Sequence, residues 1–445
     1  MIGTLNRNSR EVTIVGAGIA GMLAAYALDK SGHCVTLLEE KEQAGGLLRT
    51  VHTKYGIAEA AANSMLASPA VKDFCSELGV ELVGVRRESR ARYILRDGKL
   101  RKFPLTVKET LAALGRATFT PSQNHQDELN LGDWGRRHLG SAGVEYLLTP
   151  FVRGIYGVQP DEVGVVAAFP KLLIPPGRSL LANFLSKSFK RSSGPKKEPA
   201  AMVAPRNGMG DLVARLESHL VQRLGDRFVK GVKISKLPHA ENILLATPAH
   251  EAAWLVEPGC PRLAESLREV KYTPLVSVTA FVDRNSLTQP ISGVGVLIPA
   301  AEKRKCLGIL FSSSSFAGRV SDESRWASFT LMMGGSKDRQ WVDADDEEIN
   351  DAVRNELNQI LGIRGAPLET IINRWPRAIP QYSILLPRLW KCARETWSAA
   401  PGRMLFGNYT GHVSLRGMIE SAASLNNSDR AKLEALVQER VSAPY

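Results

Sequence analysis

The strongest constraint on the fold of this chain is a glycine cluster near its N-terminus, formed by Gly16, Gly18 and Gly21. An apolar run at 12–15 precedes the cluster, and apolar residues at helical spacing follow it as far as Ser31. This order predicts a strand, a tight turn and a helix. Gly16 permits the turn, Gly18 lets the backbone approach a diphosphate, and Gly21 lets the helix pack closely on the strand. The sequence therefore predicts a dinucleotide-binding unit with its diphosphate at the helix N-terminus.

A second strand and an acidic residue complete this unit. The apolar run 35–38 ends on Glu39, about where a dinucleotide-binding fold places the carboxylate that binds a ribose. Gly45, Gly46 and Arg49 follow, and a fold that binds only a nicotinamide dinucleotide has no evident need for them. They suit a longer ligand laid across the domain, which favours FAD. Taken alone, the glycine cluster is also compatible with an ordinary turn at a helix start.

Composition narrows the class of protein. The 445 residues suffice for two or three domains, and an apolar content of 44% with 23% charged residues is typical of a chain that folds throughout. The five cysteines are scattered, without metal-ligand spacing, so we predict neither a metal site nor a disulfide framework. The net charge of +12 favours acidic substrates, anionic lipid or nucleic acid. We predict no nucleic-acid partner, because no RNA- or DNA-binding motif is present.

The expected location is the cytoplasm, with a peripheral position on the cytoplasmic face of the membrane as a further expectation. The first ten residues lack the apolar core of a signal peptide, and no run of about 18 apolar residues occurs. One segment could bind an anionic membrane surface; its apolar face is Leu180, Leu181, Phe184, Leu185 and Phe189, and its cations are Lys187, Lys190, Arg191, Lys196 and Lys197. The alternative is a surface helix packed on its own domain, followed by a solvated loop.

The remaining pattern predicts an α/β fold with α+β parts. Asp97-Gly98 indicates a hairpin, residues 107–156 are mostly helical in pattern, and residues 275–333 are typical of an antiparallel sheet. Residues 228–234 are strand-like, and a helix is expected to begin near residues 416–417. We expect a Rossmann-type FAD-binding domain in discontinuous segments, a substrate domain with a mixed or antiparallel sheet, and a helical insert domain. The predicted boundaries are 1–80, 205–262 and 401–445 for the FAD-binding domain, 81–90 for a crossover, 91–204 for the insert and 263–400 for the substrate domain.

Taken in order, these segments make the chain resemble the flavin-containing amine oxidase superfamily, and within it the protoporphyrinogen and coproporphyrinogen oxidases. The resemblance extends nearly from end to end. It rests on the blocks Gly45–Thr50 after Glu39, Pro150–Tyr156, Gly293–Pro299, Arg374-Trp375-Pro376 with Ile379–Tyr382, and Gly407–Tyr409. The second and third blocks, and the Pro-Gln-Tyr within the fourth, are fairly specific to the porphyrinogen branch.

The resemblance implies a set of site residues. Non-covalent FAD is expected, because no His or Cys lies in a recognisable flavin-attachment motif; its expected contacts are Gly16, Gly18, Gly21, Glu39, Gly45, Gly46, Arg49, Val232, Gly407, Asn408, Tyr409, Val413 and Ser414. The expected substrate contacts are Arg92, which matches an arginine that faces a propionate, and Asn63, Gly295, Leu297 and Met332. No catalytic side chain is assigned, because the flavin performs the hydride transfer. Arg92 as a plain surface arginine and Met332 as a core residue remain alternatives.

The activity implied by the resemblance is FAD-dependent oxidation of protoporphyrinogen IX to protoporphyrin IX in porphyrin and heme biosynthesis, a six-electron reaction in three flavin cycles. Oxygen or another compound is expected to accept the electrons from the reduced flavin. A macrocycle with carboxylates at its edge needs an apolar wall and one or two cations, which this chain offers.

Three alternatives to this activity stay open. The first is coproporphyrinogen III oxidation, and the second is amine oxidation, for which neither the lysine nor the aromatic pair can be assigned. The third is a non-catalytic flavin- or porphyrin-binding relative, because Ala61, Ala62, His412 and Ala422 depart from the family pattern. The sequence predicts no oligomeric state.

Overall fold

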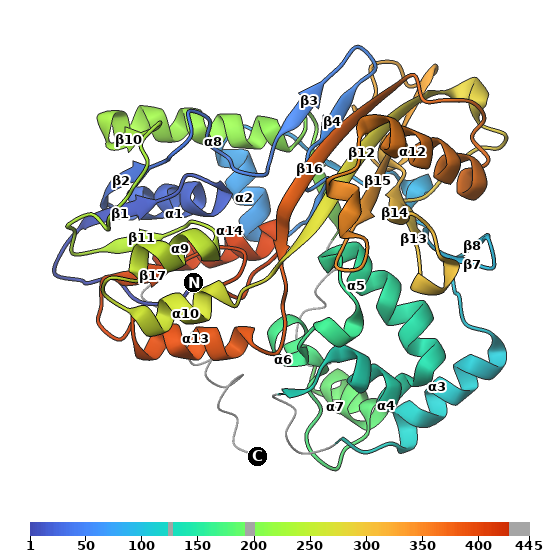
Figure 1. Cartoon of the computed structure of the whole chain (residues 1–445), viewed down its shortest axis with the longest axis horizontal. Helices are drawn as coiled ribbons and strands as arrows, with labels where there is room; N and C mark the ends of the chain where they lie inside the picture. The colour runs from blue at the N-terminus through green and yellow to red at the C-terminus, as the bar shows by residue number, and fades with distance from the viewer. Residues whose placement is uncertain (123–127, 192–200, 427–445) are drawn as a thin grey trace.

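The N-terminal motif builds one strand of a five-stranded parallel sheet whose members come from distant parts of the chain. In the computed structural model, which describes residues 1–122, 128–191 and 201–426, the strand order is β10-β2-β1-β11-β17 (Figure 1). The strands are β1 (Glu11–Val15), β2 (Cys34–Leu38), β10 (Phe228–Val229), β11 (Ile243–Leu245) and β17 (Arg403–Leu405). All four pairings are parallel, so the carboxyl ends of these strands lie along one edge.

Helices cover both faces of this sheet, because its strands carry apolar residues on both faces. One core contains Val12 and Ile14 with residues of α1 (Ile19–Lys30), α2 (Pro69–Glu77), α8 (Met209–Leu224) and α14 (Leu415–Ala423). The other contains Val15 and Leu245 with residues of α9 (Ala249–Val256), α10 (Pro261–Arg268) and α13 (Leu386–Glu395). The predicted Rossmann-type domain in discontinuous segments is therefore confirmed.

The second large element is a seven-stranded mixed sheet of order β16-β12-β15-β14-β13-β7-β8. Its strands are β7 (Arg92–Arg96), β8 (Lys99–Arg101), β12 (Tyr272–Asp283), β13 (Gly295–Leu297), β14 (Cys306–Leu310), β15 (Trp326–Gly334) and β16 (Glu369–Pro380). Only the β7–β13 pair is parallel. The helix α12 (Asp346–Leu361) packs on one face through an apolar core, which leaves the other face for the remaining domains.

Two small sheets join the parts of the chain. They pair β3 (Thr50–His52) with β4 (Ile57–Glu59), and β9 (Met202–Pro205) with both β5 (Met65–Leu66) and β6 (Leu82–Gly84).

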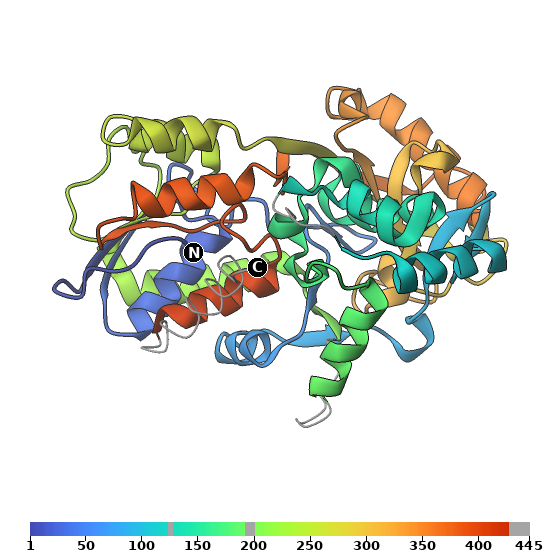
Figure 2. The ribbon, with the colours of Figure 1, turned by 90° about the horizontal axis from the view of Figure 1, so that it is seen from below.

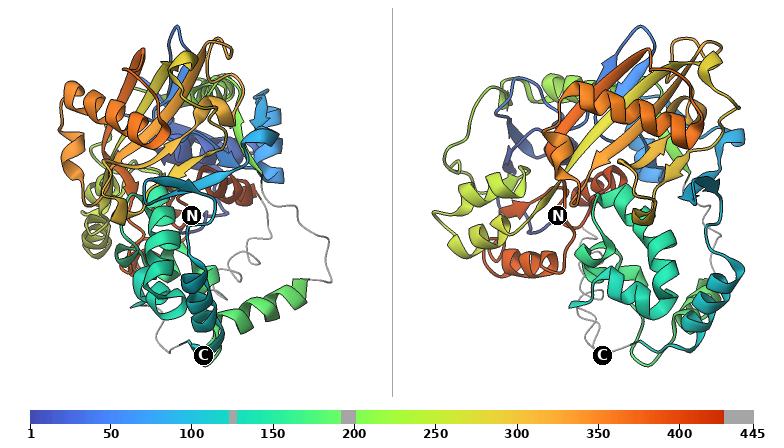
Figure 3. Two further views of the ribbon diagram at one scale, coloured as in Figure 1. Left: turned by 90° about the vertical axis from the view of Figure 1, so that its right-hand side faces the viewer. Right: turned by 45° about the vertical axis from the view of Figure 1, so that its right-hand side comes forward.

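The insert is a separate group of helices below the seven-stranded sheet in the view of Figure 1. It consists of α3 (Val107–Phe119), α4 (Leu131–Gly143), a π-helical turn (Val144–Leu148), α5 (Thr149–Tyr156), α6 (Val165–Ala168) and α7 (Leu180–Arg191). Helix α5 contacts β13 and β14, which fixes the insert against the sheet. Figure 2 and the left view of Figure 3 show α7 projecting from this group. No helix in the described ranges is long and apolar enough to cross a membrane.

The structure corrects three sequence-based boundaries. The insert was predicted to begin at residue 91, but β7 and β8 pair into the seven-stranded sheet, and the helices begin only at Val107. The predicted hairpin explains why, since Asp97 and Gly98 take φ values of 54° and 68° and fold β8 back onto β7. Helix α13 packs with α10 beneath the parallel sheet, so the end of the predicted substrate segment 263–400 lies with the FAD-binding domain.

The third correction concerns a strand that is shorter than its apolar pattern. The run 228–234 predicted one strand, yet β10 ends at Val229 because it pairs only with the last two residues of β2. The chain then turns toward Glu39, whose carbonyl oxygen accepts a hydrogen bond from the Val232 amide at 3.0 Å.

Candidate active site

The first glycine turn has the geometry that diphosphate binding requires. Gly16 has φ of +99°, and its amide donates to the Leu38 carbonyl oxygen at 2.7 Å. A Cβ at Gly21 would lie 1.8 Å from the Gly16 carbonyl oxygen, whereas a Cβ at Gly18 would meet nothing within 4 Å. Helix α1 has no side-chain cap, so its first amides are available to an anion. Gly21 thus serves packing, and Gly18 keeps the approach to the helix N-terminus open.

The second glycine turn and Glu39 lie against the first turn. The Gly45 amide donates to the Ala17 carbonyl oxygen at 2.8 Å, and a Cβ at Gly46 would lie 3.3 Å from the Gly18 Cα. The Glu39 carboxylate accepts from the Ala17 amide at 2.6 Å and from the Lys41 amide at 3.0 Å. A carboxylate has about four acceptor positions, so capacity for a ribose hydroxyl remains. We call Gly16–Gly21, Glu39 and Gly45–Arg49 the cofactor cradle.

Two further predicted cofactor segments lie near the same sheet edge. The Val232 amide donates a hydrogen bond to the Glu39 carbonyl oxygen, and Val232 is 41% exposed. The segment from Gly407 to Ser414 follows the carboxyl end of β17, and the Ser414 hydroxyl caps α14 by accepting from the Gly417 amide at 3.1 Å. This helix start was predicted near residues 416–417, and its first amides are donors beside the carboxyl edge of the parallel sheet.

Within the segment from Gly407 to Ser414, the side chain of Tyr409 has no access to a cofactor. It is fully buried in the core that also contains Tyr382, and burial raises its pKa. Its carbonyl oxygen accepts from the Trp390 indole at 2.8 Å, and the Asn408 carbonyl oxygen accepts from the Tyr382 hydroxyl at 2.6 Å. These bonds fix the backbone of the loop, while Val413 is half-buried against the same core.

The predicted substrate residues of the seven-stranded sheet all lie on one face. Arg92 is opposite Gly295 in the register of β7 and β13. Leu297 is opposite Gly308, which is opposite Met332 on β15. Because directly opposed residues project to the same side of a sheet, and residues two apart on a strand do so too, these residues share a face. We call it the substrate face; it is the side turned away from α12.

The substrate face reaches the cofactor cradle through Trp375 of β16. Trp375 is opposite Leu275 on the substrate face, and both pack in one cluster with Met332. Its indole donates to the Ala60 carbonyl oxygen at 2.7 Å, and the Arg49 guanidinium lies 5.2 Å from its ring centre. Asn63 lies three residues after Ala60, and its side-chain amide donates to the Ala61 carbonyl oxygen at 3.1 Å. The structure therefore brings Arg49 of the cradle and Met332 of the substrate face together at one junction around Trp375.

Helix α5 of the insert forms a third wall of this junction. A Cβ at Gly154 would lie 2.6 Å from the Leu297 Cδ2, and a Cβ at Gly157 would lie 2.8 Å from the Thr273 side chain. Glycines at these two positions let the helix approach the sheet closely. The junction thus has walls from the cradle, the sheet and the insert.

A buried ion pair that the sequence gave no reason to expect ties the cradle to the sheet domain. Arg319 and Glu59 are 97% and 98% buried by side chain, with Nη1 and Oε1 3.4 Å apart. The Glu59 carboxylate also accepts from the Thr50 hydroxyl at 2.7 Å and the Met209 amide at 3.0 Å. Burial raises the pKa of Glu59, and these partners oppose that shift. Glu59 therefore links Thr50, the residue after Arg49, to Arg319.

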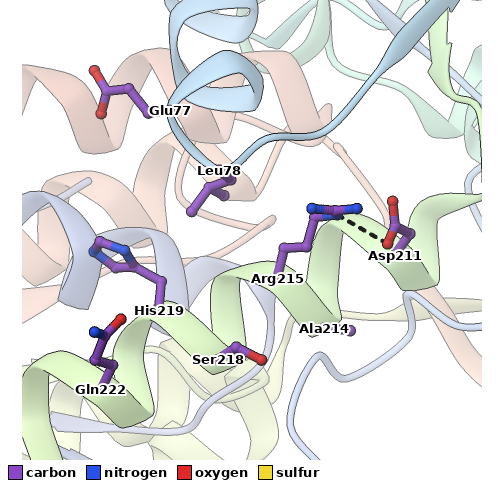
Figure 4. A pocket seen from close by; sticks show the side chains of 8 residues that line it. All are labelled: Glu77, Leu78, Asp211, Ala214, Arg215, Ser218, His219 and Gln222. Atoms are coloured by element: carbon purple, nitrogen blue, oxygen red, sulfur yellow. Dashed lines mark hydrogen bonds and ion pairs between the residues drawn. The ribbon is translucent and has the colours of Figure 1, made fainter.

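Other features lie apart from this junction. A shallow groove of about 450 Å³ runs between the end of α2 and α8 (Figure 4), and none of the predicted cofactor or substrate residues lines it. In the described part of the chain, no cluster of His, Cys, Asp and Glu is arranged to hold a metal ion. Of the residues that depart from the family pattern, Ala422 is 2% exposed and packs in a core, so its effect is on packing.

Comparison with known proteins agrees with this arrangement. A family model described as "Flavin containing amine oxidoreductase" matches residues 19–424. Protoporphyrinogen oxidase 2 of Arabidopsis thaliana is 27% identical over 93% of this chain and 92% of its own length. Coproporphyrinogen III oxidase of Bacillus subtilis is 24% identical over 91% of this chain and 94% of its own. A crystal structure of a protein from Exiguobacterium sp. 255-15 superimposes with a TM-score of 0.73 at 21% identity, over 97% and 100% of the two chains.

The fold is that of a dinucleotide-binding protein, and the junction between its parallel and mixed sheets is the candidate active site. The chain belongs to the flavin-containing amine oxidoreductases, since that family's model spans most of its length. It is therefore a flavin-dependent enzyme with FAD as its cofactor, and the two glycine turns with Glu39 fit that ligand.

Proposed function

We propose that this enzyme oxidises protoporphyrinogen IX to protoporphyrin IX, with the removal of six electrons and six hydrogens from the macrocycle. The observation that carries the proposal is the substrate face, where an arginine at the sheet edge and an apolar wall meet the cofactor cradle. This combination suits a flat, largely apolar ring with carboxylates at its edge. The names of relatives that cover nearly the whole chain support the same substrate class.

Each wall of the junction has a defined task in this reaction. The exposed Arg92 pairs with a propionate, Leu297 and Met332 hold the ring, and close packing of α5 keeps water out. FAD supplies the hydride acceptor, held by the cradle. The amides at the start of α14 stabilise negative charge near their end of the cofactor.

Comparison of the two porphyrinogens tests the proposal. Purified protein, assayed in air, is expected to oxidise protoporphyrinogen IX with a higher kcat/KM than coproporphyrinogen III, which has two further carboxylates to place. The opposite order would assign the enzyme to coproporphyrinogen. A yellow protein that leaves both porphyrinogens unoxidised would be the non-catalytic relative. Oxygen is the proposed electron acceptor, and turnover that requires an added acceptor would replace it.

Non-covalent binding of FAD is a separate part of the proposal. Acid precipitation is expected to release the flavin into the supernatant, because the cradle binds through backbone amides and a carboxylate. Flavin that remains in the pellet would show a covalent link.

We also propose a peripheral position on the cytoplasmic face of a membrane, for which the insert offers an apolar surface. Val107, Leu111 and Leu114 repeat on one side of α3 and are 78%, 63% and 52% exposed. Phe184 of the neighbouring α7 is 66% exposed. Arg101, Lys102 and Lys108, which precede or begin α3 in the sequence, are exposed cations. Of the cationic segment first predicted here, residues 192–200 and the side chains 187–191 lie outside the described residues.

Vesicles containing anionic lipid test this surface. Wild-type protein is expected to co-sediment at low salt and to dissociate at high salt, since each cation near such a surface contributes about 1 kcal/mol. Leu111→Ser with Leu114→Ser should abolish binding. Val221→Ser is the matched control, because Val221 is 49% exposed on α8 of the FAD-binding domain. Equal sedimentation of all variants would reject the proposal.

A further inference from the structure

The substrate face carries one methionine that remains partly in contact with solvent. Met1, Met202 and Met332 are half-buried, and of these three Met332 lies on the substrate face, whereas Met202 lies on β9 of a separate sheet. All nine methionines lie in the described ranges, and the other six are buried, namely Met22, Met65, Met209, Met333, Met404 and Met418. A small oxidant in the junction therefore has one accessible thioether beside it.

Met332 lies in the same apolar cluster as Trp375, the residue that contacts the cofactor cradle. The Arg49 guanidinium of the cradle is 5.2 Å from the Trp375 ring centre. Within the sheet, Met332 is opposite Gly308, which has no side chain to cover it from that strand. Leu275 fills a position of the same cluster, so apolar packing here does not require sulfur. A small product formed at the cradle thus arises close to the Met332 thioether.

We propose that Met332 is a site of oxidation by hydrogen peroxide formed during turnover, and that its sulfoxide slows the enzyme. This inference rests on the proposed function, in which oxygen accepts the electrons. In each flavin cycle, two electrons and two hydrogens leave the macrocycle and reach O2, which becomes H2O2.

The modification is a two-electron oxidation of sulfur. The Met332 sulfur attacks one oxygen of H2O2, and the O–O bond breaks as the S–O bond forms. The departing hydroxide takes the proton of the transferred oxygen and becomes water. The sulfur is oxidised to the sulfoxide, the peroxide is reduced, and no further reactant is needed.

The oxidised side chain changes the wall that holds the macrocycle. A sulfoxide is polar, and it replaces an apolar group in the row that also contains Leu297 and Gly308. Binding of a largely apolar ring against this wall is weakened, because the sulfoxide oxygen must give up its hydrogen bonds to water. The cradle consists mainly of backbone groups, so it keeps its cofactor. The enzyme therefore loses substrate affinity with use.

Peptide mass spectrometry after turnover tests the inference. The flavin-loaded enzyme oxidises protoporphyrinogen IX in air, in the dark to prevent photo-oxidation, and with catalase to remove peroxide from bulk solution. Trypsin cleaves after Arg325 and Lys337, so Met332 and the buried Met333 lie in one peptide, where fragment masses separate them. Oxidation of Met332 is expected to rise with the number of turnovers and to exceed that of the half-buried Met202 about tenfold. Enzyme kept with protoporphyrin alone should stay unmodified.

Met332→Leu tests the effect on activity, because leucine keeps an apolar side chain and has no thioether. Each enzyme is compared with its own initial rate. Wild type is expected to slow with turnover through a KM that rises about fivefold, with unchanged flavin content. Met332→Leu should keep its initial rate over about fivefold more turnovers, and Met202→Leu, the matched control, should decline like wild type.

Three outcomes overturn the inference. Equal oxidation of Met202 and Met332 would assign the modification to bulk oxidants. An intact Met332 in wild type, or a decline of Met332→Leu as fast as wild type, would reject the site or its effect. A peroxidase-coupled dye in a parallel sample without catalase separates these failures from failure of the proposed function. Peroxide formation with an intact Met332 rejects the inference alone, porphyrin formation without peroxide removes oxygen as the acceptor, and absence of porphyrin rejects the proposed activity.

Discussion

The cofactor cradle and the substrate face contribute to one junction but are assembled differently. The cradle comes from residues 16–49, and it consists mainly of backbone groups exposed by glycine. The substrate face combines residues from 92 to 375, and it consists of side chains aligned by strand register. A local motif thus fixes where the cofactor binds, whereas tertiary pairing fixes what lies opposite it. Variants of the two regions should therefore lose different properties.

Loss of the buried ion pair between Glu59 and Arg319, which lies next to the cradle, should have the largest effect on stability. Arg319→Met leaves the Glu59 carboxylate buried without its cation, which should lower the free energy of unfolding by about 3–5 kcal/mol. Glu59→Leu combined with Arg319→Met should recover most of that loss. Arg206→Met, which breaks the exposed pair with Glu81, should cost less than about 1 kcal/mol. Chemical denaturation measures all three; equal losses for both arginines would contradict the role of burial.

Two glycines of one turn should respond in opposite ways. Gly21→Ala forces a methyl group onto the Gly16 carbonyl oxygen and should lower the free energy of unfolding by about 3 kcal/mol, with loss of bound flavin. Gly18→Ala has open space for its methyl group, so it should fold normally while its flavin affinity falls. Thermal unfolding and flavin titration separate the two effects. Normal flavin affinity in Gly18→Ala would show that the turn does not approach the cofactor.

Removal of the cation from the substrate face should affect the substrate and spare the cofactor. Arg92→Ala is expected to raise KM for porphyrinogen about 10- to 100-fold, since a bidentate arginine–carboxylate contact contributes roughly 1.5–3 kcal/mol. Arg92→Lys should rescue little, because it lacks the planar fork. Arg262→Ala, on α10 of the FAD-binding domain, is the exposed control. Steady-state kinetics that are normal in both Arg92 variants would make Arg92 a plain surface residue.

The contact between the sheet edge and the insert should depend on pH. Arg96 bonds the Glu109 carboxylate at 2.7 and 3.0 Å and lowers the pKa of Glu109 from 4.5 to about 2. Since the folded-state pKa is depressed, the contact stabilises the protein above pH 4.5, and this gain is lost as the pH falls toward 2. Glu109→Gln should cost about 1 kcal/mol at neutral pH, because solvent screens the pair. A difference from wild type that persists at pH 2 would contradict this cause.

Sequence reasoning succeeded where the determinant is local. The turn at Gly16, the hairpin at Asp97-Gly98 and the start of α14 each follow from neighbouring residues, and all were predicted. The limits of the insert were missed, because β7 joins a sheet whose other strands lie far along the chain.

The unpredicted parts of the junction have the same physical origin. No spacing rule connects Glu59 with Arg319, 260 residues later. The burial of these polar groups arises only when the two sheets meet. Tyr409 shows an opposite limit of sequence reasoning. It lies in a block that resembles the family, but its ring is buried in the core, so only its backbone is available to the site.

Anaerobic rapid mixing of the flavin-loaded enzyme with protoporphyrinogen IX tests most directly whether the substrate face delivers its ligand to the cradle. Flavin absorbance and porphyrin fluorescence report the two sides of one reaction. Bleaching of the flavin is expected in wild type, with slower bleaching in Arg92→Ala at low substrate concentration and equal rates at saturation. Flavin that stays oxidised in the presence of protoporphyrinogen IX and of coproporphyrinogen III would contradict this transfer from substrate to cofactor.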